Sequence, residues 1–512
     1  MTFRDRPSNP VTIVGGGPVG LSLAIALARH GVRSTLLERK PAISEHSKAP
    51  AIHIRTREAF RQWGVDERFL DAGTLRPELV LHSPEDNRAL LPVDFSELDD
   101  ETDRPGVLVL EQGETERLLL EAVQESGWCD VRFSTTAIGL HNDNGGVTVT
   151  ARDDDGEYSL TSQYVVGCDG AGSFVRTAIG QPFAGITYRV RPMLADVVLN
   201  DERDELLWPR THNGPAGITT TLRIRPNLWR VIWLHGSDGD APDEVTDAEV
   251  DDRVAEVLGP GPVDVVWASR FRIHRRSSPR FRVGRVLLAG DAAHVHSPVG
   301  GLGMNAGIQD AHNLAWKLAY ALRGGDVDRL LDSYGVERRA VVVESVSQYT
   351  DVLTRLFLQT PAAARSGLFA AGRLAMAVPI MRRQALRRAS MLDLGYPDSP
   401  LLRNSVRAAG TRLPNVAVQA PDGSHVRLHD LLGYEPALLD SSEEPDVAAK
   451  APIGRVIRVG DDGYRDPSGR LDRLTGGRPG WTLVRPDGHV AWALDRPDRL
   501  SDAIAHALGG PA

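Results

Sequence analysis

Cysteine is almost missing from this sequence. Only Cys129 and Cys168 occur in 512 residues, and they do not form a C-x-x-C pair. Two isolated cysteines cannot build the disulfide framework on which many small secreted domains depend, and they offer no redox-active dithiol motif. The cysteine content therefore fits the reducing cytoplasm.

Long apolar runs and a positive net charge are also lacking. The most apolar late segment, residues 368–381, is interrupted by Arg373 and Pro379 and is too short to span a bilayer. No basic segment followed by an apolar one precedes the first predicted strand, so we expect a cytoplasmic protein without a transmembrane segment. The formal net charge of −9 argues against a nucleic-acid partner.

The composition is that of an ordinary globular protein. Hydrophobic residues make up 41% of the chain and charged residues 25%, which is enough to bury a sizeable core. A length of 512 residues predicts about two to four domains.

The first strongly patterned stretch is a strand, a glycine-rich turn and a helix. Residues 11–14 form a β-branched strand, GGGPVG follows at 15–20, and residues 21–29 are predicted to be helical. A second strand over residues 34–37 ends at Glu38, near the spacing at which a carboxylate accepts ribose hydroxyls. The glycines allow a tight turn, and the helix N-terminus receives a pyrophosphate. This pattern predicts a dinucleotide site but does not choose between FAD and NAD.

The most informative stretch is GRVLLAGDAAHVHSPVGGLGMNAGIQDAHNLAWKL, residues 284–318. Residues 286–289 read as a buried parallel strand, and Asp291 then stands just past its carboxyl end, where α/β sheets receive ligands. A Gly- and Pro-rich loop follows, and helical spacing begins near Met304. The N-terminus of that helix favours negative charge in the loop.

A third motif, YVVGCDGAGSFVR over residues 164–176, completes the set. Asp169 ends a strand, Gly170 and Gly172 permit a turn, and Ser173 is a candidate helix cap. In their order along the chain, the three motifs closely resemble those of the single-component (class A) flavoprotein monooxygenases, the aromatic hydroxylases. The resemblance implies an α/β FAD-binding Rossmann-like (GR2-type) fold.

The resemblance also implies which residues contact the cofactor. In this reading Glu38 binds the adenosine ribose, Gln112 reaches the ribityl or phosphate region, Ala137 lies against adenine, Asp291 holds the ribityl chain, and Pro298 borders the reacting edge of the flavin. Lys48 stands where the family usually has an arginine near the flavin, with a solvated surface lysine as the alternative. The full predicted set is Gly15, Gly17, Pro18, Gly20, Glu38, Arg39, Lys48, Gln112, Ala137, Asp169, Gly290, Asp291, Pro298, Gly301, Gly303, Met304 and Asn305.

Residues 181–280 change character, because β-branched and aromatic residues alternate. Strands over 217–224 and 228–234 flank a turn at Arg225-Pro226-Asn227. We expect an antiparallel sheet inserted into the flavin domain, with one face on a substrate cavity. Period two places alternate residues on one face of each strand, as substrate candidates or as plain sheet core: Ile218, Thr220, Leu222, Trp229, Val231 and Trp233.

The rest of the chain divides into helices and a final unit. Residues 281–400 return to the flavin domain begun in 1–180 and continue as helices, whose arginines suit either an anionic membrane surface or packing at domain boundaries. The patterns APDGSHVRLHDLLG and WTLVRPDGHVAWAL, within 401–512, resemble the thioredoxin-like C-terminal domain of the phenol-hydroxylase and polyketide-hydroxylase branch. Without cysteines, that domain is expected to serve packing, dimerisation or shielding.

The implied function is hydroxylation of an aromatic, phenolic or polyketide-like small molecule. NADH or NADPH reduces FAD, the reduced flavin takes up O2 as a C4a-hydroperoxide, and one oxygen atom is transferred to the ring. Backbone N–H groups around Gly303, Met304 and Asn305 would support the charge of reduced flavin. No catalytic acid or base and no metal site stand out, and a monomer or homodimer is expected.

Two other classes of function use the same scaffold. A halogenase usually carries W-x-W-x-I-P, which Trp229-Arg-Val-Ile-Trp233 does not match, and a disulfide reductase needs a cysteine pair. Other FAD oxidases or reductases stay open as enzyme alternatives. The non-enzyme alternative is a flavoprotein that binds or sequesters an aromatic antibiotic.

Overall fold

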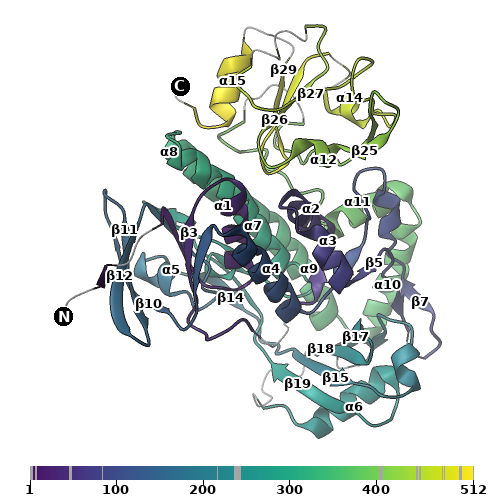
Figure 1. Ribbon diagram of the computed structural model, residues 1–512. Helices are drawn as coiled ribbons and strands as arrows, with labels where there is room; N and C mark the ends of the chain where they lie inside the picture. The colour runs from purple at the N-terminus through teal and green to yellow at the C-terminus, as the bar shows by residue number, and fades with distance from the viewer. Residues whose placement is uncertain are drawn as a thin grey trace.

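A six-stranded, mostly parallel sheet is the largest in the described part of the chain and lies in the left half of Figure 1. The computed structural model describes residues 4–5, 9–44, 49–83, 85–215, 217–235, 244–402, 408–444, 448, 451–475, 477, 479–494 and 499–510. All neighbouring strands of this sheet are parallel except the edge pair β21/β22. In spatial order the strands are β21 (Arg282–Val283), β22 (Val286–Leu288), β13 (Tyr164–Gly167), β2 (Val11–Val14), β3 (Ser34–Leu37) and β9 (Cys129–Arg132).

The sheet is buried because both of its faces are covered, as its nearly continuous apolar strands require. One face carries the helices α1 (Pro18–Arg29), α4 (Gln112–Ser126) and α7 (Gly303–Leu322). The other face carries an antiparallel meander of β10 (Thr136–Asn142), β11 (Val147–Asp153) and β12 (Gly156–Ser162), which the short β1 (Arg4–Asp5) extends. The three layers form the flavin-domain fold implied by the motifs.

One predicted strand is divided in the structure. The alternating pattern of residues 131–140 predicts a single strand that forms a hairpin with residues 147–151. In the structure Val131 belongs to β9 of the parallel sheet and Thr136 begins β10 of the meander. Between them, Ser134 adopts a left-handed φ of 49°, which turns the chain from one layer to the next. Hydrophobic alternation alone does not reveal that change of layer.

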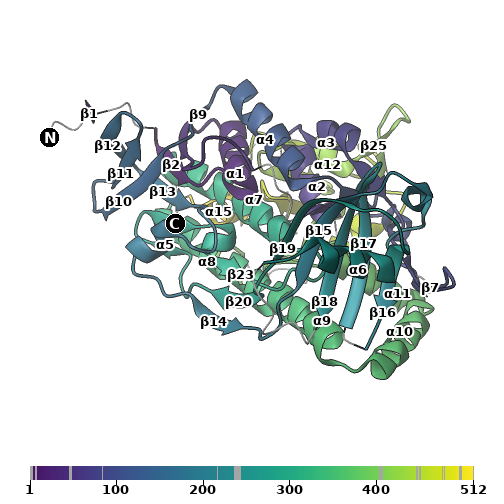
Figure 2. The same ribbon diagram turned by 90° about the horizontal axis from the view of Figure 1, so that it is seen from below.

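The inserted antiparallel sheet is present as expected. Its spatial order is β16 (Thr211–Asn213), β17 (Gly217–Arg225), β18 (Leu228–His235), β15 (Met193–Val198) and β19 (Asp264–Arg270). Helix α6 (Asp247–Leu258) covers one of its faces. Figure 2 shows the sheet beside the helices α9 (Ser347–Gln359), α10 (Ala362–Met376) and α11 (Pro379–Ala389).

Several arginines of these later helices contact neighbouring elements of the fold. Arg365 is buried and donates to Asn213 Oδ1 at 2.7 Å, while Arg382 donates to Glu97 at 2.8 Å. Arg383 donates to Glu101 Oε1 at 2.8 Å. These contacts favour the domain-boundary interpretation over the membrane one. Within the described residues we find no helix with both the length and the apolar character needed to cross a membrane.

The C-terminal unit is a mixed four-stranded sheet at the top of Figure 1. Its central strand β26 (Ala437–Asp440) pairs in parallel with β27 (Val456–Arg458) and antiparallel with β28 (Trp481–Val484). The Pro486-Asp487-Gly488 sequence predicts a hairpin turn, and the fourth strand, β29 (Val490–Leu494), forms this hairpin with β28. This strand order matches the expected thioredoxin-like unit.

The turn of that hairpin inserts charged side chains into the flavin domain. Glu337 lies on helix α8 (Val327–Arg339), and Arg485 donates to both of its carboxylate oxygens, at 2.7 and 2.8 Å. Lys317 of α7 donates to the same carboxylate at 2.7 Å, and all three side chains have no exposed surface. Burial by itself would raise the pKa of Glu337, but the charges of Arg485 and Lys317 outweigh it and lower that pKa. The carboxylate is therefore ionised and shared by two cations.

Replacing Glu337 by Gln should destabilise the protein by about 3–5 kcal/mol, because Arg485 and Lys317 would be left buried without their carboxylate. Urea unfolding followed by tryptophan fluorescence measures the effect. Glu344→Gln is the matched control: Glu344 lies on the same continuous run of helix but is exposed, so its effect should stay within about 0.5 kcal/mol. Equal losses in the two variants would contradict the assignment.

Candidate functional site

Three loops meet at the carboxyl end of the parallel sheet. Strand β13 lies between β2 and β22 and is parallel to both. The Gly15 turn, the Asp169 turn and the Gly290-Asp291 turn therefore emerge side by side at one edge, where such sheets bind ligands. The Cβ position of Gly15 lies only 2.4 Å from the Cys168 carbonyl oxygen, so a side chain there would collide with the neighbouring loop.

A cavity of about 300 Å³ opens at this edge. It collects most of the residues that the first and third motifs predicted, together with Gln112 of α4 and Ala137 of β10, although these segments are far apart in sequence. The predicted residues that line it are Gly15, Gly17, Pro18, Glu38, Arg39, Gln112, Ala137 and Asp169. Lys48 lies outside the described residues.

The glycine turn leaves the start of α1 open toward the cavity. Gly17, the residue before the helix, has free space where a side chain would stand, and the first turn of α1 holds no acidic residue. Gly20 does not line the cavity; its Cβ position lies 2.0 Å from the Gly15 carbonyl oxygen, so it permits the close helix–strand packing. The turn suits a phosphate group at the positive end of α1.

Glu38 is fixed at the cavity wall by backbone donors. Its carboxylate accepts the Gly16 N–H at 2.6 Å and the Lys40 N–H at 2.9 Å. A second carboxylate, Glu116, also lines the cavity, and sequence reasoning missed it. Glu116 accepts the Gln112 amide at 2.8 Å, and burial raises its pKa. The i, i+4 spacing of Gln112 and Glu116 was the available signal.

Asp169 lines the cavity and also organises its own turn. Its carboxylate accepts the Ser173 hydroxyl at 2.5 Å and the Val175 N–H at 3.1 Å. Ser173 accepts the Arg176 N–H at 2.9 Å, which confirms the predicted cap of α5 (Phe174–Ala178). The Arg176 guanidinium then donates to the Ala292 carbonyl at 3.0 Å. The third motif is thus tied directly to the second.

The second motif forms a loop that ends at the start of α7. Asp291 and Pro298 are both exposed, and α7 begins at Gly303 with no acidic residue in its first turn, which also contains Met304. His296 lies half-buried close to Gly303, and its buried Nε2 atom has no hydrogen-bond partner within the described part of the chain. This end of the loop offers polar groups that a ligand can satisfy.

Asn305 holds this loop in place with its side chain. Its Nδ2 group donates to the Ala51 and Gly301 carbonyls, each at 2.9 Å, and its Oδ1 atom accepts the His53 N–H at 2.9 Å. The His53 ring adds a contact of 3.1 Å between Nε2 and the Gly300 carbonyl oxygen. The loop is therefore clamped to the segment between β4 (Ala51–Ile52) and α2 (Ile54–Gln62). Sequence reasoning missed His53.

The two faces of the inserted sheet have different neighbours. Trp229, Val231 and Trp233 are fully buried against α6 in a separate apolar core. We therefore leave these three out of the substrate site, because period two sets which residues share a face but not which face meets the flavin domain.

Ile218, Thr220 and Leu222 lie on the other face of the sheet, since Ile218 pairs with Leu234 and Thr220 with Ile232. Leu234 and Ile232 pack in a cluster that contains Val299 of the flavin-motif loop and Leu358 of α9. This apolar face therefore approaches the loop. Tyr188, in the same cluster, donates to Asp351, and burial raises its pKa to about 12.

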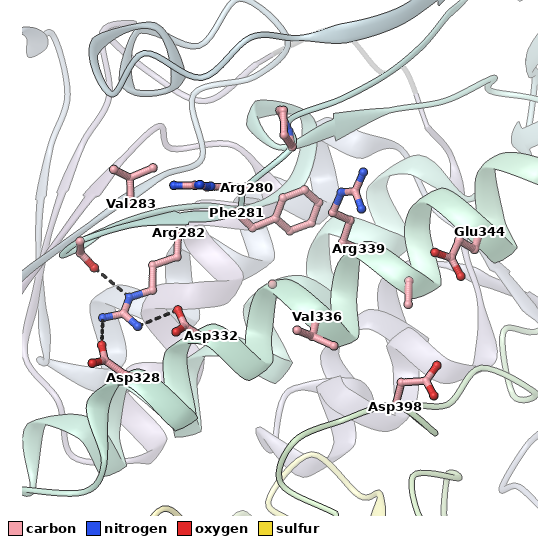
Figure 3. Close-up of a pocket in the computed structure, with 14 residues that line it drawn as sticks. Arg280, Phe281, Arg282, Val283, Asp328, Asp332, Val336, Arg339, Glu344 and Asp398 are labelled. Carbon is pink, nitrogen blue, oxygen red and sulfur yellow. Dashed lines mark hydrogen bonds and ion pairs between the residues drawn. The ribbon is translucent and has the colours of Figure 1, made fainter.

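A larger open groove of about 840 Å³ lies elsewhere, between β21 and α8. Figure 3 shows that Arg282 in its wall is held by Asp328 and Asp332, each at 2.8 Å. None of the residues predicted for the flavin or substrate site lines this groove. We therefore assign the site to the smaller cavity at the strand ends.

Comparison with known families decides the identity of the fold. Residues 8–349 match the model of the FAD binding domain, and residues 406–511 match that of the aromatic-ring hydroxylase C-terminal domain. The chain belongs to the FAD-dependent aromatic-ring hydroxylase family. It is an FAD-dependent aromatic monooxygenase, and FAD is its cofactor.

Individual relatives cover the hydroxylase almost completely. An uncharacterized aromatic compound monooxygenase of Bacillus subtilis is 35% identical over 94% of each chain. The structure of the anhydrotetracycline hydroxylase OxyS from Streptomyces rimosus has a TM-score of 0.82 at 32% identity and covers 99% of this chain and 100% of its own. Aklavinone-11 hydroxylase, solved with FAD and aklavinone, has a TM-score of 0.82 at 26% identity, with 99% and 100% coverage.

One relative carries a different name. A dialkyldecalin synthase of Streptomyces rugosporus is 32% identical over 99% of this hydroxylase and 100% of its own chain. The scaffold therefore also occurs in a protein named for a synthase activity rather than for oxygen transfer.

The contact between the buried His53 ring and the Gly300 carbonyl makes the stability of the protein depend on pH. Burial lowers the pKa of His53 to about 4, although hydrogen bonds to Gly300 and Gly301 raise it in part. Because the folded pKa lies below the unfolded value of 6.5, the stabilisation is complete above pH 6.5 and is lost as the pH falls toward 4, by on the order of 3 kcal/mol. His53→Gln keeps a donor for Gly300 but does not titrate.

We expect His53→Gln to lose less stability than the wild type between pH 6.5 and pH 4, as measured by thermal melting at several pH values. The exposed His141 provides the control, and His141→Gln should follow the wild-type curve. Parallel curves for His53→Gln and wild type would show that the ring does not titrate as the structure indicates.

Proposed function

We propose that this hydroxylase transfers one oxygen atom from O2 to an electron-rich aromatic compound, phenolic or polyketide-like, with NADH or NADPH as the electron donor. The observation that carries the proposal is the approach of an apolar sheet face to the flavin-motif loop, through Leu234 and Val299. An oxygen-transfer site needs a dry, apolar environment beside the cofactor, and these side chains would supply one wall of it.

The residues at the strand ends fit FAD. A side chain at Gly15 or Gly20 would collide with neighbouring backbone, and Gly17 leaves space in front of the α1 N-terminus. In our assignment the pyrophosphate lies there, Glu38 accepts the ribose hydroxyls, Gln112 serves the phosphate or ribityl region, and Ala137 faces the adenine. When bound, FAD supplies hydride acceptance and O2 activation.

The second motif would hold the reactive end of the cofactor. Asp291 is exposed beside the Gly15 turn and accepts ribityl hydroxyls in our assignment, while Pro298 borders the flavin edge. The open N-terminus of α7, at Gly303, Met304 and Asn305, stabilises negative charge with backbone N–H groups. The side chain of Asn305 is already used by the loop clamp, so its part is played by the backbone.

The substrate would lie between the sheet and the loop. Ile218, Thr220 and Leu222 belong to the sheet face that approaches Val299, and Leu353 and Phe357 of α9 pack against the same cluster. Apolar walls exclude water and bind a flat ring. Tyr188, whose hydroxyl donates to Asp351, is a polar group in this wall that can accept a hydrogen bond from a substrate hydroxyl.

The rival function is a non-oxygenating conversion on the same scaffold, which the dialkyldecalin synthase relative brings to attention. Such an enzyme needs no NAD(P)H turnover. Oxygen incorporation into the product therefore separates the two functions.

Glu38→Ala and Asp291→Ala should each weaken FAD binding by about 1.5–3 kcal/mol, or roughly tenfold to a hundredfold, because cofactor hydroxyls would lose a charged acceptor. The measurement is the Kd for FAD from quenching of flavin fluorescence. Asp154→Ala, in an exposed hairpin turn, is the control and should bind like the wild type. Wild-type affinity in both site variants would overturn the assignment.

The enzyme should consume NAD(P)H slowly alone and much faster with its true aromatic substrate. In our assignment FAD takes the Gly15 turn, so NAD(P)H binds transiently, and tying reduction to substrate occupancy prevents wasteful peroxide release. Stopped-flow absorbance follows the reduction, and mass spectrometry should find a product about 16 Da heavier. Equally fast reduction without any aromatic ligand, and no oxygenated product across a panel of phenols and polyketides, would favour an oxidase or reductase.

A further inference from the structure

A path of buried hydrogen bonds, linked by two consecutive residues of α8, leads from the C-terminal unit to the second flavin motif. It begins at the hairpin turn between β28 and β29, where Asp487 fixes the orientation of Arg485 through two hydrogen bonds, of 3.1 and 2.5 Å. Both side chains are at most 1% exposed. Asp487 is itself held by Asn313 of α7, at 2.9 Å, and by the Trp316 indole, at 3.3 Å.

The path then enters helix α8. Arg485 binds both carboxylate oxygens of Glu337, and Asn313 donates to the same carboxylate at 2.7 Å. The bidentate contact fixes the rotation of α8 at this turn, because a planar guanidinium tolerates little displacement of its partner. The next residue on the helix, Arg338, is consequently aimed at α7.

Arg338 carries the path to Asp310. Its Nε group donates to Asp310 Oδ1 at 2.7 Å, and Nη2 donates to the Ala306 carbonyl at 3.0 Å. Both partners lie on α7, one and two turns after its start at the flavin-motif loop. Its Nη1 group donates to the Tyr396 hydroxyl at 3.1 Å, and the Tyr396 ring packs 4.3 Å from the His489 ring of the C-terminal unit. Arg338 is therefore held from two sides.

Asp310 ends the path at the motif itself. Its Oδ2 atom accepts the Gly290 N–H at 2.9 Å and contacts His294 Nε2 at 2.7 Å. Burial alone would raise the pKa of Asp310, but His294 and Arg338 outweigh it and lower that pKa, so the carboxylate stays charged. Gly290 directly precedes Asp291, and its φ of 60° places it in the left-handed region. The turn that presents Asp291 is thus hydrogen-bonded to this buried carboxylate.

We propose that Arg485 and Asp487 of the C-terminal unit are positioning residues for the flavin-binding turn, acting through Glu337, Arg338 and Asp310. The proposal rests on the assignment of Gly290-Asp291 to FAD binding, and it gives the C-terminal unit a role that its lack of cysteine leaves open. The unit sets the geometry of this turn through two buried charge pairs, Arg485–Glu337 and Arg338–Asp310, which are joined by consecutive residues of α8 and have few alternative positions.

Arg485→Lys tests the proposal, because lysine keeps the charge but cannot bind Glu337 and Asp487 in the same fork geometry. We expect FAD release from the holoenzyme to become about tenfold faster, followed by flavin fluorescence after dilution. Hydrogen exchange of the Gly290 amide in the same holoenzyme should also speed up. Should Arg485→Lys fail to fold, Asp487→Asn is expected to give smaller changes in the same direction.

Arg412→Lys is the matched control. Arg412 also joins the C-terminal part to the flavin domain through a buried bidentate contact, with Glu58 of α2, and is 1% exposed. The hydrogen bonds of Glu58 go to Arg55, Thr102 and Arg412, and Arg55 donates in turn to the Asp487 main-chain carbonyl at 2.6 Å. This network therefore meets the hairpin turn at its backbone and not at the side chains that bind Glu337. Arg412→Lys should therefore destabilise the protein but release FAD at the wild-type rate. Equal acceleration in both variants would reduce the effect to general loosening and overturn the proposal.

A double variant tests whether Arg485 acts through Asp310. Asp310→Asn should itself accelerate FAD release, and adding Arg485→Lys should change the rate little further if both lie on one path. If the two substitutions instead multiply each other's effect on the rate of FAD release, the two residues act independently and the proposal is contradicted. A wrong assignment of Gly290-Asp291 to FAD binding would give a different result. Asp291→Ala would then leave FAD binding unchanged, whatever the Arg485 variants do.

Discussion

The parallel pairing of β13 with both β2 and β22 is the constraint on which the site depends. Parallel strands all present their carboxyl ends at one edge, so three turns separated by more than a hundred residues are forced into contact. The resulting fit is tight enough that a side chain at Gly15 would strike the Cys168 carbonyl. The cofactor cavity follows from this pairing, and its wall is completed by Gln112 and Ala137 from neighbouring layers.

The helix α7 links the cofactor site to the remainder of the molecule. Its first turn stands at the flavin-motif loop, and its middle carries Asp310, Asn313 and Lys317 at helical spacing, directed toward α8 and the C-terminal unit. Buried charges of this kind are costly unless every partner is present, which makes the arrangement specific rather than merely stabilising. The C-terminal unit supplies one of the required cations, Arg485, and cannot be regarded as an independent appendage.

The proposed substrate side of the site is formed by apolar packing and not by the ends of parallel strands. The inserted sheet buries one face against α6, with Trp229 and Trp233, and turns the other toward Val299 and α9. The first face is a closed core, whereas the second meets a loop that would carry the cofactor. An aromatic substrate of the proposed kind would be bound there by exclusion of water, with Tyr188 and Asp351 as a polar exception in the wall.

Local patterns in the sequence determined the strands β2, β3 and β22, the helix after the Gly-rich loop and the two hairpins at residues 225–227 and 486–488, because hydrophobic period, glycine and proline act over a few residues. The motifs also implied the FAD family. Only the tertiary structure decided that residues 131–140 divide between two layers, that Trp229, Val231 and Trp233 face α6, and that Asn305 clamps the loop with its side chain. It alone brought Glu116 into the cavity and Arg485 to Glu337, since contacts between residues that lie far apart in the chain depend on how layers pack and leave no local period to detect.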